Sequence, residues 1–157
     1  MKLFVRLAMA ISAVLMLATA SFADDSASQG SGMGDGVHKL ALQISDNDPI
    51  KMNTVLNVAA NVSRLYSEKG EEVDIKIVAF NAGLHMLRSD TTPVAERMKS
   101  FAQSMPNVTF EACNNTREAM AKKEGKEIPL LDNAVVVPAG VVTLMELDAD
   151  GYTIVRP

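Results

Sequence analysis

Apolar and polar positions along this chain follow a repeating strand and helix pattern after residue 36. Apolar runs of strand length occur five times, at residues 38–44, 73–80, 108–112, 134–137 and 152–155. Segments with apolar residues at helical spacing lie between them, at residues 49–69, 92–105, 115–124 and 141–147. Strands that alternate with helices indicate parallel strands joined by right-handed helical crossovers. The predicted fold class is therefore α/β, flavodoxin-like or Rossmann-like, an open parallel sheet of about five strands with helices on both faces.

The first predicted helix has clear signals at both ends. Asp48 can accept a hydrogen bond from the free N–H groups of the first turn, and Pro49 follows where its missing N–H is harmless. Lys69 and Gly70 close the helix with a cation and a residue that tolerates positive φ. The next strand becomes wholly apolar toward residue 80, which favours a buried central position in the sheet.

The N-terminus has the pattern of a targeting segment. Lys2 and Arg6 precede an uncharged run of 14 residues from Leu7 to Ala20, and small residues follow at 21 and 23. We predict a cleaved signal peptide at residues 1–23 and an exported, periplasmic mature protein. An uncleaved anchor is the alternative, but a bilayer span needs about 20 apolar residues. We therefore expect no stable membrane span after cleavage.

The predicted domain follows a short leader. Residues 24–36 are rich in glycine and serine, so we expect a disordered linker there and a single folded domain at residues 37–157. Without the first 23 residues the chain has 13 basic and 19 acidic side chains. Because nucleic-acid binders normally present a basic face, we expect no nucleic-acid partner.

Composition also limits the cofactors. Two histidines and one cysteine cannot form a zinc finger or a disulfide framework, and calcium-binding spacing is absent, so we expect no metal site. The segment after the first strand, residues 45–48, is acidic where a phosphate-binding loop needs glycine and free N–H groups. We therefore expect no nucleotide, FMN or other cofactor.

The fold places the candidate site before its chemistry is considered. Ligands of open α/β sheets bind beyond the carboxyl ends of the strands. Cys113 lies at such a position, between a strand and a helix start, where free N–H groups favour a thiolate. A thiolate can attack a sulfur donor and carry the sulfur as a persulfide. A buried, purely structural cysteine is the alternative.

Several segments, in this order, resemble the DsrE/DsrF-like family. They are the turn at residues 81–84, the segment 110–116 around Cys113, and the ending from Pro138-Ala139-Gly140 to Tyr152. The resemblance covers roughly residues 37–157 and implies a small flavodoxin-like domain associated with sulfur relay. It also implies a homotrimer or homohexamer, and the apolar residues 135–137 and 141–142 agree with self-association. The sulfur-carrying cysteine of the family, where present, matches Cys113.

These observations lead to two functional hypotheses. In the first, the protein is an exported thiol-based sulfur carrier, or a sulfurtransferase-like protein, that loads persulfide sulfur on Cys113. His85 is the candidate for proton transfer, and the expected partners are a sulfur donor or acceptor protein or a small sulfur species. The residues expected to contact the sulfur or its donor are Asn81, Gly83, Asn114 and Asn115. In the second hypothesis, the protein is a non-catalytic oligomeric binding or assembly module with a structural cysteine.

Overall fold

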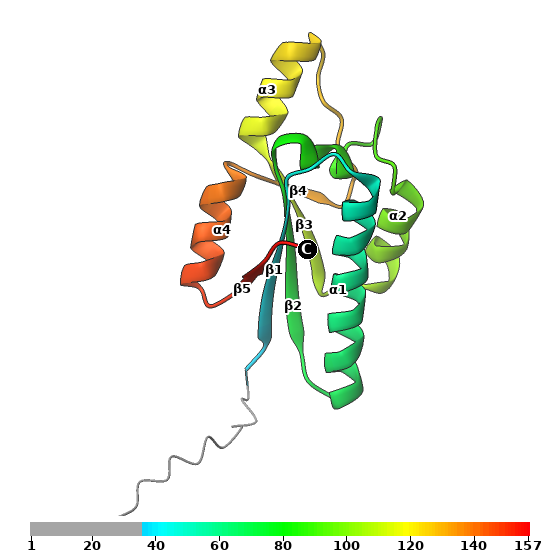
Figure 1. Cartoon of the computed structure of the whole chain (residues 1–157), viewed down its shortest axis with the longest axis vertical. Helices are drawn as coiled ribbons and strands as arrows, with labels where there is room; N and C mark the ends of the chain where they lie inside the picture. Colours follow the sequence, from blue (N-terminus) through cyan, green and yellow to red (C-terminus); the bar gives the residue numbers. More distant parts are fainter. Residues whose placement is uncertain (1–35) are drawn as a thin grey trace, which may run out of the picture. The chain divides into compact units, whose positions relative to one another are not determined.

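A computed structural model describes residues 36–157 of the chain (Figure 1). The predicted signal peptide and nearly all of the predicted linker lie outside these described residues. The elements are β1 (His38–Ile44), α1 (Pro49–Lys69), β2 (Val73–Ala79), the 3-10 helix η1 (Asn81–Leu87), α2 (Ala95–Ser104), β3 (Val108–Cys113), α3 (Asn114–Glu124), β4 (Ala134–Val137), α4 (Gly140–Ala149) and β5 (Thr153–Val155).

The five strands form one parallel sheet in the order β4-β3-β2-β1-β5. This confirms the predicted open α/β sheet of about five strands. From β1 to β4 each new strand is added on the same side, and β5 then returns to the opposite side of β1. The carboxyl ends of β2, β3 and β4 therefore lie side by side, and the segments that follow them meet there.

The long helix α1 forms where its end signals predict. The carboxylate of Asp48 accepts a hydrogen bond from the N–H of Ile50 at 2.8 Å, and Pro49 occupies the first turn. Gly70 ends the helix with φ of 71°, a conformation that costs glycine little because it has no Cβ.

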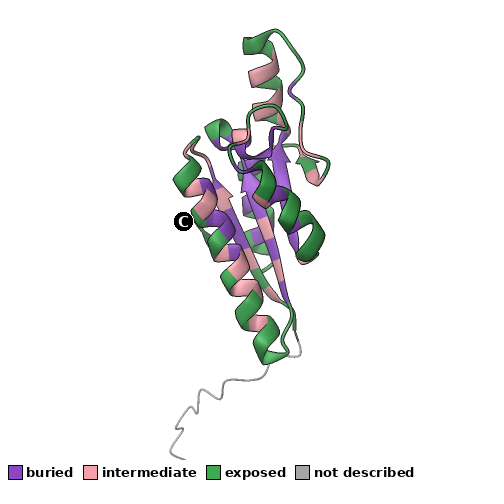
Figure 2. Cartoon of the chain, turned by 90° about the vertical axis from the view of Figure 1, so that its right-hand side faces the viewer, coloured by how far each residue is buried: buried purple, intermediate pink, exposed green. Residues whose placement is uncertain are grey.

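One face of the sheet carries the larger core. Helices α1 and α2 and the 3-10 helix cover it, and their apolar side chains pack on alternate residues of β1, β2 and β3. Figure 2 shows the buried positions concentrated in the strands and in the helix surfaces that face them. The residues with no exposed surface in this core include Leu42, Met52, Val55, Leu56, Ile75, Ile77, Leu84, Met86 and Leu87.

The opposite face of the sheet is covered by α4. Leu144 and Leu147 of this helix pack on a smaller core with Val78, Phe80 and Cys113. Both faces therefore carry helices, as predicted, but α4 has only ten residues and a row of exposed apolar side chains. Within residues 36–157, no helix is both long and apolar enough to cross a membrane.

Candidate functional site

Cys113 is the last residue of β3 and the residue that precedes the first turn of α3. Its side chain belongs to the smaller core and is 5% exposed. The sequence pattern places the start of this helix at residue 115, whereas the helix begins one residue earlier, at Asn114. The side chain of Asn114 donates a hydrogen bond to Glu118 at 2.7 Å. Cys113 thus occupies the N-cap position, where a side chain faces the free N–H groups of the helix.

A second helix also starts at this thiol. A Cβ on Gly140, the first residue of α4, would lie 3.3 Å from the Cβ of Cys113 and 3.0 Å from that of Phe80. These distances are tighter than ordinary Cβ contacts, so a side chain at this position would require Phe80 or Cys113 to shift by a few tenths of an ångström. The N–H of Asn115 donates to the carbonyl oxygen of Pro138 at 3.3 Å and so ties the two helix starts together. The positive ends of two helix dipoles therefore converge on one sulfur.

This surrounding shifts the titration of the thiol. Burial raises the pKa of Cys113, but the hydroxyl of Thr116 and the N–H groups of Gly140, Thr116 and Asn115 lower it by more. The net pKa of the thiol is therefore below its ordinary value. The N–H contacts from α3 do not have the geometry of a regular cap hydrogen bond. Contacts of this kind commonly tighten when the reacting group takes up its charge.

Thr116 links the thiol to the end of β2. Its Oγ1 accepts a hydrogen bond from the main-chain N–H of Asn81 at 3.0 Å. The same hydroxyl lowers the pKa of the Cys113 thiol. Asn81 has a φ of 49°, so the chain makes a left-handed turn that aims its N–H at this hydroxyl. Thr116 is not among the site residues expected from the sequence. Its spacing of three residues from Cys113 is the signal that could have found it, because an N-cap side chain faces the third residue of its helix.

An open groove of about 360 Å³ lies along the first turns of α3, and Cys113 is not among the residues that line it. It is lined by Asn81, Asn115, Thr116, Ala119, Met120 and Lys123. Asn115 and Thr116 line this groove, and both also lower the pKa of the Cys113 thiol. An anion in the groove would meet the ammonium group of Lys123 and the N-terminal end of α3.

The other residues that the sequence assigned to the site do not place their side chains at the Cys113 sulfur. Gly83 is buried, and a Cβ there would lie 2.2 Å from the carbonyl oxygen of Ile44, so this glycine lets η1 pack on the end of β1. The Nδ1 of His85 pairs with the hydroxyl of Thr91 at 2.8 Å, and His85 is not among the groups that shift the titration of the thiol. The side chain of Asn114 bonds to Glu118, as above, rather than facing the sulfur. Asn81 and Asn115 contribute through their main chains.

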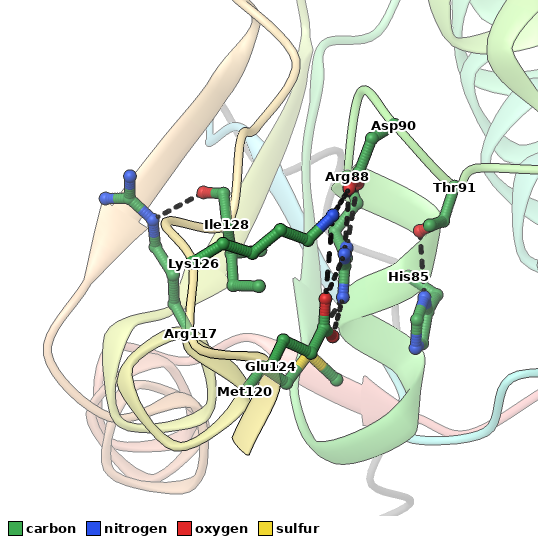
Figure 3. A network of polar contacts seen from close by, with 9 residues as sticks. All are labelled: His85, Arg88, Asp90, Thr91, Arg117, Met120, Glu124, Lys126 and Ile128. Atoms are coloured by element: carbon green, nitrogen blue, oxygen red, sulfur yellow. Dashed lines mark hydrogen bonds and ion pairs between the residues drawn. The ribbon is translucent and has the colours of Figure 1, made fainter. Parts of the chain in front are cut away.

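A cluster of ion pairs fixes the far end of α3 (Figure 3). Arg88, only 1% exposed, donates two hydrogen bonds to Glu124, at 2.5 and 2.9 Å, and two to Asp90, both at 2.9 Å. Lys126 is the second cationic side chain of the cluster, and its Nζ lies 3.0 Å from Asp90. Arg88 holds the pKa values of Asp90 and Glu124 below their ordinary values through these bonds. Because α3 has no fully buried residue, this cluster attaches it to the domain together with Met120, which packs against the larger core.

Together these features define an open parallel α/β domain with one buried thiol, of lowered pKa, at the carboxyl edge of its sheet. No side-chain cluster within residues 36–157 has the three metal-binding groups that would suggest a metal site. The chain is similar to MTH1491, a protein of unknown function from Methanobacterium thermoautotrophicum, whose solved structure superposes with a TM-score of 0.62. That similarity has 26% identity and covers 76% of this chain and 99% of the other. No family model and no curated protein match the sequence.

Proposed function

We propose that this protein is an exported thiol-based sulfur carrier, or a sulfurtransferase-like protein, that loads persulfide sulfur on Cys113. The observation that carries the proposal is the convergence of the α3 and α4 N-termini on the Cys113 side chain, which lowers the pKa of the thiol from its ordinary value despite burial. A thiolate is the reactive form of cysteine toward sulfur donors. A persulfide anion at the same position would be stabilised by the same N–H groups and hydroxyl.

The transfer needs no oxidant besides the sulfur donor. The Cys113 thiolate attacks the terminal sulfur of a hydropolysulfide, and a new sulfur–sulfur bond forms. The bond between that terminal sulfur and the rest of the donor breaks, and its electron pair leaves with the shortened polysulfide. The cysteine then carries one persulfide sulfur, which a thiol of an acceptor can remove by the reverse type of exchange.

The resemblance to the DsrE/DsrF-like family supports the same proposal and adds an expected homotrimer or homohexamer. The order of the matching segments is consistent with the observed order of elements, since the segment around Cys113 spans the junction of β3 and α3.

Export to the periplasm rests on the pattern of residues 1–23 alone. Sequencing the N-terminus of the protein from its own host tests it, and intact residues 1–23 on a soluble protein would contradict it.

A second candidate function is favoured by a separate observation. Cys113 is only 5% exposed and packs against Phe80 and Leu144, as an inert core cysteine does. In this case the protein is a non-catalytic binding or assembly module, and the low thiol pKa has no functional use. The two candidates differ in whether the folded protein accepts sulfur.

Intact mass spectrometry after incubation with polysulfide distinguishes them. The carrier hypothesis predicts that the folded chain gains the mass of one sulfur atom, that dithiothreitol removes it, and that Cys113→Ser abolishes the gain without changing the melting temperature by much. The chain has no other cysteine, so no second thiol can complicate the result. A folded chain that gains no sulfur, combined with a strongly destabilised Cys113→Ser variant, would support the structural role instead.

A further inference from the structure

Asn81 has an unusual backbone conformation for its residue type. Among residues 36–157 it alone, glycines aside, has a positive φ, at 49°. Most side chains disfavour this left-handed conformation because their Cβ approaches the following carbonyl oxygen, whereas glycine and, less often, asparagine adopt it. A non-glycine residue stays in this conformation only where the surrounding structure holds it, which is common at functional sites.

The peptide group between Phe80 and Asn81 is held at both of its ends. The carbonyl oxygen of Phe80 accepts a hydrogen bond from the N–H of Gly83 at 3.0 Å, and the N–H of Asn81 donates to Oγ1 of Thr116 at 3.0 Å. The chain before this peptide belongs to β2, and Gly83 after it is buried against the end of β1. Because both sides are fixed, the direction of the Asn81 N–H depends on the φ angle of Asn81.

The hydroxyl of Thr116 needs such a fixed partner to point in one direction. A threonine hydroxyl rotates and has one hydrogen and two lone pairs. Inside a helix it commonly donates that hydrogen to a carbonyl oxygen three or four residues earlier, which would direct it away from a nearby acceptor. The bond from Asn81 occupies a lone pair of the Thr116 oxygen, so the hydrogen lies on another side of that oxygen.

We propose that Asn81 is a positioning residue for the thiol of Cys113. Its left-handed backbone aims the Asn81 N–H at the Thr116 oxygen, and this bond turns the hydroxyl hydrogen toward the sulfur. Of the groups that lower the pKa of Cys113, the Thr116 hydroxyl has the largest effect, which supports this orientation. The inference rests on the proposed function for its purpose, since a reacting thiolate is what needs the oriented donor.

A purely structural turn is the competing explanation. In that case the left-handed residue only directs the chain from β2 into η1, and substitutions there change the stability of the fold without changing the titration of the thiol. The positioning role instead predicts that the titration midpoint of Cys113 follows the tolerance of residue 81 for positive φ. The side chain of Asn81 is exposed, so its replacement opens no cavity in the core.

The test is the pH dependence of alkylation of Cys113 by iodoacetamide in the folded chain, followed by intact mass. Only the thiolate reacts, and limited access to the sulfur scales the rate equally at every pH, so the midpoint reports the thiol itself. Asn81→Gly keeps the left-handed conformation and should leave the midpoint unchanged. Asn81→Val disfavours it most, and should move the midpoint to higher pH and lower the rate below the midpoint by about threefold to tenfold.

Two further variants complete the experiment. Asn81→Ala should give an intermediate shift, and it provides the comparison with Asn81→Gly if Asn81→Val does not melt as a folded protein. In a Thr116→Val background, Asn81→Val should cause no additional shift, because the hydroxyl that it orients is already absent.

Three results would overturn the inference: an unchanged midpoint in folded Asn81→Val and Asn81→Ala, an equal shift in Asn81→Gly, or a shift from Asn81→Val that persists in the Thr116→Val background. Alkylation needs no sulfur donor, so these results are separate from a failure of the proposed function. That failure would instead be an unmodified chain that gains no sulfur from polysulfide.

Discussion

The role of Thr116 gives the sharpest test of the activated thiol. Thr116→Val replaces the hydroxyl by a methyl group of similar size and so removes one donor from the Cys113 sulfur. The N–H of Asn81 loses its acceptor as well, but Asn81 is exposed and water can replace that bond. The change should therefore act on the thiolate rather than on the fold.

The size of the effect follows from the burial of the sulfur. A hydrogen bond to a charged group contributes about 1.5–3 kcal/mol, and the 5% exposure of Cys113 leaves little solvent to screen the loss. We use the lower end of this range for Thr116→Val, because the N–H groups around the sulfur still stabilise the thiolate in the variant. About 1.5 kcal/mol corresponds to a roughly tenfold smaller population of thiolate at any pH below the midpoint of its titration.

The assay is the thiolate absorbance in the ultraviolet as a function of pH, with Cys113→Ser subtracted to remove the contribution of the two tyrosines. The midpoint should move to higher pH in Thr116→Val, and the rate of sulfur loading below that midpoint should fall about tenfold. Asn114→Ala is the matched control, since Asn114 is also in the first turn of α3 but bonds to Glu118. An unchanged midpoint in Thr116→Val, or an equal shift in Asn114→Ala, would refute the reasoning.

Three further predictions concern the framework of the site. Arg88→Met should lower the free energy of unfolding by clearly more than the roughly 0.5 kcal/mol of a surface substitution, because it removes the buried countercharge of Asp90 and Glu124. Chemical denaturation measures this, and a loss no larger than that of a surface substitution would contradict the importance of the cluster. Since the pKa values of Asp90 and Glu124 are lowered in the folded state, their contribution to stability is present above their ordinary pKa and is lost as the pH falls through the lowered values. The loss in acid should therefore be steeper for the unmodified chain than for Arg88→Met, and parallel profiles would contradict this. Gly140→Ala should slow sulfur loading and cost about 1–2 kcal/mol, because its Cβ would push α4 away from Phe80; normal loading kinetics would show that the start of α4 does not matter.

Most helices and strands could be predicted from the sequence, because the residues that determine them act on their immediate neighbours in the chain. The strand His38–Ile44 and the helix from Asp48 to Gly70 follow from apolar periodicity and from residues that act on their immediate neighbours. The order of the strands was not predicted, since it depends on which faces cover one another. The start of α3 was misplaced by one residue because Asn114 and Asn115 are both acceptable near a helix start, and only the path of β3 decides between them.

The candidate site was less accessible because its parts come from three separate segments. Cys113 could be singled out as the one cysteine at a strand end. The position of Gly140 against it, and the bond from Asn81 to Thr116, depend on the packing of β2, β3 and α4. Gly83 was assigned to ligand binding because it lies in a turn at the correct edge, whereas its function in the fold is close packing on β1.

The most direct test of the central claim compares the folded and unfolded chain in their reaction with hydropolysulfide at neutral pH. Unfolding exposes Cys113 fully but removes the N–H groups and the Thr116 hydroxyl that stabilise its thiolate. If the site activates the thiol, the folded chain gains sulfur faster than the chain unfolded in urea, despite the burial of the sulfur. If sulfur is gained only after unfolding, Cys113 is a structural core residue, and the proposed carrier function is wrong.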